Sequence, residues 1–81
     1  IMYKAHAIKL RCQVEDLKYL SNIKGALIKE LDHQLTSLEG EIESMAFHFE
    51  YEEMTMDGQT VFHEVRLICS CTTVLEEKFD A

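Results

Sequence analysis

The chain has 81 residues, of which 47% are apolar and 28% are charged, with three glycines and no proline. This composition excludes an intrinsically disordered segment, while a single domain of this size buries little surface without a partner. Fifteen acidic and eight basic residues give a formal net charge of −7, which disfavours direct binding to nucleic acid or to an anionic membrane surface.

The chain also contains three cysteines, and no apolar run approaches the roughly 20 residues that cross a bilayer. An odd number of cysteines favours a reducing compartment, so we expect an intracellular protein of the cytoplasm or nucleus. Because the sequence begins with Ile1 and not with methionine, we expect it to be a fragment of a larger protein.

Apolar side chains recur at alternating steps of three and four residues between Tyr3 and Met45. An apolar repeat that averages 3.5 residues stays on one side of a helix only if the helix winds around a partner. The repeat therefore predicts that residues 1–45 form one long coiled-coil helix. Its predicted oligomer interface consists of Tyr3, Leu10, Val14, Leu17, Leu20, Leu27, Ile28, Leu31, Leu35, Leu38, Ile42 and Met45.

The charges beside this repeat favour an antiparallel coiled coil. Basic Lys4 and Arg11 flank its first half, whereas acidic Asp32 and Glu39 flank its second half. Reversing one helix places these opposite charges together, which selects orientation more than it adds stability. The expected partner is a second copy or a related coiled-coil chain.

The polar segment 21–25 leaves two alternatives for this helix. Its serine, asparagine and glycine suit a short loop, so the chain could fold back there as a helical hairpin. The apolar register stays in phase on both sides of the segment, which a loop does not require. We therefore favour the continuous helix.

The apolar period changes from 3.5 to 2 after Met45. Phe47, Phe49 and Tyr51 alternate with polar residues, and Asp57-Gly58 suits the positive φ angles of a type I′ turn. Residues 46–81 are therefore predicted to form a β-hairpin that caps one end of the helical bundle.

Two details of this predicted cap depend on local spacing. An extra residue near Glu52-Glu53, or a wider loop over residues 54–60, would place the apolar side chains of both strands on one face. Thr73 and Glu76 have the spacing of a capping box, so we expect a short C-terminal helix from Thr73 through Phe79.

Few residues form a pattern that indicates chemistry. His63, Cys69 and Cys71 share one strand face, but their spacing and the missing fourth ligand do not match a structural zinc site. The sequence has no phosphate-binding glycine loop, calcium loop or recognisable nucleophile turn, so we predict no enzyme activity, no catalytic residue, no metal and no cofactor. The predicted patch for a protein partner consists of Met54, Met56 and Phe62.

These features together predict an α+β fold and a non-catalytic oligomerisation and protein–protein interaction module. In this hypothesis the long helix joins chains and the hairpin end meets another protein. The alternative is the dimerisation segment of a nucleic-acid-binding regulator, such as a transcription factor or a chromosome-associated protein. Its basic element would lie outside this sequence.

Overall fold

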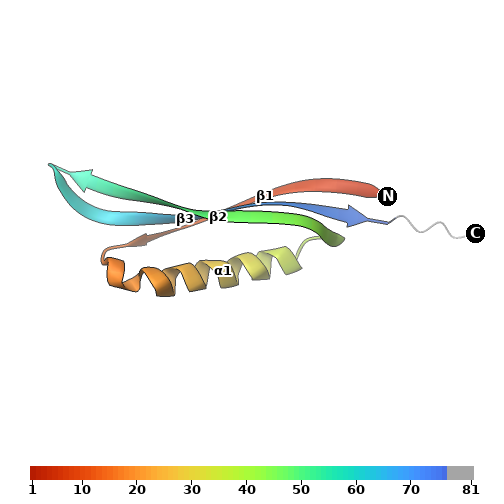
Figure 1. Ribbon diagram of the computed structural model, residues 1–81, viewed down its shortest axis with the longest axis horizontal. Helices are drawn as coiled ribbons and strands as arrows, with labels where there is room; N and C mark the ends of the chain where they lie inside the picture. Colours follow the sequence, from red (N-terminus) through yellow and green to blue (C-terminus); the bar gives the residue numbers. More distant parts are fainter. Residues whose placement is uncertain (77–81) are drawn as a thin grey trace, which may run out of the picture.

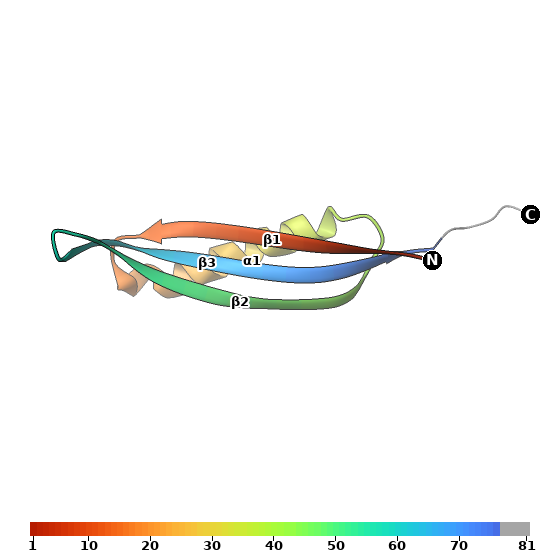
Figure 2. The same cartoon turned by 90° about the horizontal axis from the view of Figure 1, so that it is seen from above.

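The computed structural model describes residues 1–76 and consists of a three-stranded antiparallel sheet with one α-helix against one face (Figure 1). The strand order is β1-β3-β2, so β3 lies in the centre and the other two strands form the edges (Figure 2). In chain order the elements are β1 (Met2–Val14), the 3-10 helix η1 (Leu17–Tyr19), α1 (Leu20–Thr36), β2 (Glu41–Met56) and β3 (Gln59–Leu75).

The coiled-coil helix predicted for residues 1–45 is wrong, and so is the alternative of a helical hairpin. The α-helix covers only Leu20–Thr36, residues 21–25 lie inside it, and residues 45 and 46 are consecutive positions of β2. The error arose in β1, where Leu10 and Val14 fit a helical spacing and a strand spacing equally well. Alternation of apolar and polar residues from Ile8 to Val14 is the period of a strand with one buried face.

Local capping and apolar spacing account for α1. The Asp16 side chain accepts a hydrogen bond of 2.9 Å from the Lys18 backbone N–H and so caps η1, the 3-10 turn that leads directly into α1. At the other end, the hydroxyl groups of Thr36 and Ser37 both donate to the His33 carbonyl. The apolar side chains that face the sheet follow at intervals of three or four residues: Leu20, Ile23, Leu27, Leu31 and Leu35.

The core lies between α1 and the sheet, and β3 supplies its centre. Val65, Leu67 and Cys69 are at most 1% exposed because they lie on the face of the central strand that the helix covers. Among residues 1–76 the buried core has eight apolar members: Val14, Leu27, Leu31, Leu35, Val65, Leu67, Cys69 and Cys71. A core of this size covers one face of the sheet and leaves the other face open.

The turn predicted at Asp57-Gly58 is present, with φ angles of 53° and 76°. Its two-residue form rules out the wider loop over residues 54–60. Thr55 pairs with Thr60 but Met54 pairs with Phe62, so the extra residue lies on β3, beside the turn, and not near Glu52-Glu53. This shift places Phe49 opposite Leu67, on the face that carries α1.

The short C-terminal helix predicted from Thr73 is also wrong. Thr73 pairs with Lys4 on one side and Ile42 on the other, and β3 continues to Leu75. The strand continues because both of its neighbours extend as far, which outweighs a local capping pattern. Phe79, where the helix was expected to end, lies outside the described residues.

Candidate protein-interaction surface

The residues of the predicted oligomer interface fall into two groups. Seven of them fill or contact the core between α1 and the sheet: Leu10, Val14, Leu20, Leu27, Leu31, Leu35 and Leu38. The other five remain exposed on the surface: Tyr3, Leu17, Ile28, Ile42 and Met45. Most of the apolar stripe is thus used within one chain, and only the second group is available to a partner.

The predicted partner patch lies at the far end of the hairpin. Met54 and Phe62 face each other across β2 and β3, and both are partly buried. Met56 lies beside the turn and is 68% exposed. This end of the hairpin extends beyond both β1 and α1 (Figure 1). Met56 lies two residues further along β2 than Met54 and pairs with Gln59.

More large apolar side chains are exposed on β2 than on either of the other two strands. Every one of its sixteen residues is exposed except Phe49 and Met54. Met45, Phe47 and Tyr51 pair with β3 residues of the buried face, yet they remain 45%, 44% and 53% exposed. We call Met45, Phe47, Phe49 and Tyr51 the β2 strip.

The position of α1 explains why the β2 strip is exposed. The helix lies against β1 and β3, and it crosses the sheet obliquely, so that its last turns reach the outer side of β1 (Figure 2). The first half of β2 therefore has no helix beneath it. Along the strip, the Phe47 and Phe49 rings meet edge to face at 6.4 Å, and the Phe49 and Tyr51 rings stack at 6.5 Å.

The helix continues this apolar surface along its flank nearest β2. The Lys24 ammonium lies 4.8 Å from the centre of the Phe49 ring and 5.9 Å from that of Tyr51, which identifies this flank. Ile28, one turn further along the same flank, is 44% exposed. Leu17 lines a shallow hollow together with Tyr51. We call Ile28, together with Leu17 of the preceding turn η1, the α1 flank.

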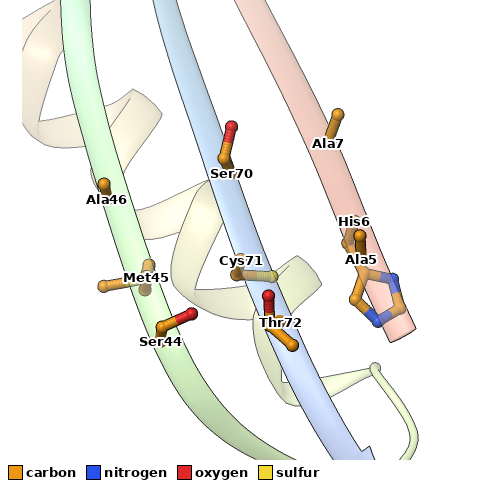
Figure 3. Close-up of a pocket in the computed structure, with 9 residues that line it drawn as sticks. All are labelled: Ala5, His6, Ala7, Ser44, Met45, Ala46, Ser70, Cys71 and Thr72. Carbon is orange, nitrogen blue, oxygen red and sulfur yellow. The ribbon is translucent and has the colours of Figure 1, made fainter. Parts of the chain in front are cut away.

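The sheet face opposite α1 begins with a flat area of small side chains. They come from the same end of all three strands and leave a shallow open hollow across the sheet (Figure 3). Its floor consists of Ala5, Ala7, Ser44, Ala46, Ser70 and Thr72. None of the described residues that line this hollow is a lysine, arginine, aspartate or glutamate, so it presents a flat and weakly polar surface.

The middle of the same face is charged, with Arg66 at its centre. Its Nη1 donates to Glu52 and to Glu64, both at 2.8 Å, and its Nε donates to Glu50 at 3.5 Å. The pKa of Arg66 is raised by these carboxylates, Glu52 first. The pKa of Glu50 is lowered by its hydrogen bond with His48 and then by Arg66. Arg66 thus balances part of the negative charge along β2.

The cysteine and histidine residues considered as ligands do not form a site. Cys69 and Cys71 are free thiols in the core, and burial raises the pKa of Cys69, so little reactive thiolate is present there. His63 pairs with Val14 near the opposite end of β3. Within residues 1–76, no group of three or more histidine, cysteine or carboxylate side chains is placed to hold a metal ion.

The chain matches no family model, no curated protein and no solved structure. No helix in the described part of the chain is long and apolar enough to cross a membrane. The surface therefore has to be interpreted from its own geometry.

Sequence reasoning missed Phe47 and Tyr51 as surface residues, although their alternation with polar residues was visible. Alternation identifies one face of a strand, and that face was expected to rest on the end of a helical bundle. Whether the face is covered depends on which strand lies at the edge and where the helix crosses. The alternation of apolar and polar residues predicts neither the edge strand nor the position of the helix.

Proposed function

We propose that this chain is an oligomerisation and protein–protein interaction module that acts by joining chains and not by catalysis. The observation that carries the proposal is the row of apolar side chains along the β2 strip, beside the α1 flank from which Lys24 reaches over the Phe49 and Tyr51 rings. Aromatic and aliphatic side chains gather there at an open strand edge, where a partner can bury them.

The shape of the molecule supports the same function. Its long axis measures 68 Å and its radius of gyration is 17.3 Å, whereas a compact chain of this length has a radius of about 12 Å. An elongated sheet with one helix buries less apolar surface than a globular domain of equal length. A partner that covers the exposed apolar surface therefore adds stability.

The open strand edges provide a second means of association. β1 has 13 residues and β2 has 16, and each has only β3 as its neighbour in the sheet. The outer N–H and C=O groups of such strands can pair with another strand. Pairing at β2 would bury apolar side chains and satisfy backbone groups at the same time.

The proposal is tested by measuring the mass of the chain in solution by sedimentation equilibrium. We expect the mass to rise with concentration above the 9.4 kDa of one chain, because association buries the exposed apolar surface. A mass of one chain at every concentration up to about 1 mM would contradict self-assembly, since even an association worth about 4 kcal/mol is half complete there. Unfolding in urea should return the mass to that of one chain.

A further inference from the structure

More large apolar side chains are exposed on β2 than on β1: β2 has Ile42, Met45, Phe47, Tyr51 and Met56, whereas β1 has Met2 and Tyr3. The α1 flank faces β2, whereas the opposite flank of the helix carries Glu30 and Gln34, which bond to each other at 3.2 Å. β1 contains Lys4, Lys9 and Arg11 and no carboxylate, so two β1 strands side by side could form no pair of opposite charges between them. The β2 edge is therefore the surface that needs a partner.

We infer that this partner is a second copy of the chain, paired antiparallel along β2 about a two-fold axis at Phe49. The inference rests on the proposed function and adds the surface through which two copies join. Two three-stranded sheets would become one sheet of six strands, with both helices on the same face. The two β2 strips would then meet in the space between the helices.

The side chains of β2 are complementary to themselves in this register. Phe49 faces Phe49 of the other copy, and Phe47 faces Tyr51, so the aromatic rings form one continuous row. On the opposite face of the sheet, His48 of each copy faces Glu50 of the other, and Ala46 faces Glu52. No carboxylate within β2 faces another carboxylate.

Neighbouring registers lack this complementarity. An axis at Phe47 places His48 against Ala46, and an axis at His48 places it against its own copy, so both lose the His48–Glu50 pairs. An axis at Glu50 places that carboxylate against its own copy. Like charges directly opposite each other destabilise a strand pair and opposite charges stabilise it, which selects the axis at Phe49.

The antiparallel arrangement also covers the exposed half of each strip. The start of α1 lies near Tyr51, whereas Met45 and Phe47 have no helix of their own beneath them. Because Tyr51 of one copy faces Phe47 of the other, the α1 flank of each copy comes close to the uncovered residues of its partner. Each helix then supplies the cover that the other copy lacks.

The first test replaces an aromatic residue on each edge with lysine. Phe47→Lys places a charge in the centre of the proposed contact, so we expect the dissociation constant of the dimer to rise at least about 100-fold. Tyr3→Lys is the matched control, since Tyr3 is 60% exposed on β1, and it should leave the mass unchanged. Circular dichroism and thermal unfolding verify that each variant is folded.

The second test uses His48, which is exposed and lies away from the core, and circular dichroism verifies that each of its variants is folded. His48→Lys should tighten the dimer because the ammonium faces Glu50 of the other copy, and His48→Glu should weaken it. With the axis at His48 itself, lysine would face lysine and weaken the dimer. That result would overturn the proposed register.

The outcomes separate the inference from the proposed function. An assembly that survives Phe47→Lys, or that is lost with Tyr3→Lys, overturns the β2 contact while leaving the oligomerisation function in place. A wild-type chain that stays monomeric at every concentration overturns both. Loss of the dimer in Phe47→Lys alone, with opposite effects of the two His48 variants, supports the inference.

Discussion

Gly40 allows the chain to turn from α1 into β2. Its φ angle is +90°, in the left-handed region that side chains disfavour, and a Cβ atom at this position would lie 2.6 Å from the Val74 carbonyl oxygen. That neighbour is backbone in the strand β3 and cannot move aside cheaply. Gly25 differs, because a Cβ atom there would meet nothing within 4 Å on the surface of α1.

These two glycines give a matched pair of substitutions with opposite effects. Gly40→Ala should lower the free energy of unfolding by about 1–3 kcal/mol, because it combines backbone strain with a steric clash. Gly25→Ala should raise it by up to about 1 kcal/mol through better helix propensity. Urea denaturation measures both values. A Gly40→Ala variant as stable as the wild type would show that the loop does not approach β3 so closely.

At the scale of the elements, Arg66 links the two strands of the hairpin across the face opposite α1. It contacts Glu50 and Glu52 on β2 as well as Glu64 on its own strand. Because Glu50 and Glu52 are exposed, their ion pairs with Arg66 are individually weak. Their arrangement around one cation nevertheless makes the contribution depend on pH in a definite direction.

Replacing Arg66 with methionine should lower the thermal unfolding temperature at pH 7 and change it little at about pH 2. The folded-state pKa of Glu50 is lowered, by the His48 hydrogen bond first and then by Arg66. Its stabilising contribution is therefore present above the ordinary carboxyl pKa and is lost as the pH falls through the lowered value. Lys29→Met removes an equal charge from the surface of α1 and serves as the control. Equal losses at both pH values would assign the effect to packing.

At the scale of the whole molecule, the net charge of −7 opposes the association of two copies. The His48 and Glu50 contacts attract locally, but the total charge of both copies repels over a distance comparable with the screening length. The apolar contact between the β2 strips must overcome this repulsion. Association should accordingly depend on ionic strength.

We expect the dimer to tighten as the salt concentration rises from about 0.05 to 0.5 M, because screening weakens the repulsion between like-charged copies. Sedimentation equilibrium at several salt concentrations measures the dissociation constant. Weakening with salt would contradict this expectation. It would favour an assembly in which basic β1 of one copy pairs with acidic β2 of the next.

Local chemistry accounts for the parts of the fold that could be predicted. The Asp57-Gly58 turn depends on two adjacent residues that accept positive φ angles, and the alternation around Phe49 depends on neighbours two positions apart. Both signals lie within a few residues of the structure they specify. For the candidate surface, the same local signals predicted an apolar face on the strand but not what covers that face.

The amino-acid sequence by itself determined the hairpin turn and the apolar faces of the strands, because those depend on neighbouring residues. The identity of β1 as a strand was decided by tertiary structure, since Met2 pairs with Leu75 at the far end of the described chain. Between Leu10 and Val14 the spacing fits a helix and a strand alike, and only pairing with β3 selects the strand. The exposure of the β2 strip was decided in the same way, by the place of β2 at the edge and the oblique course of α1.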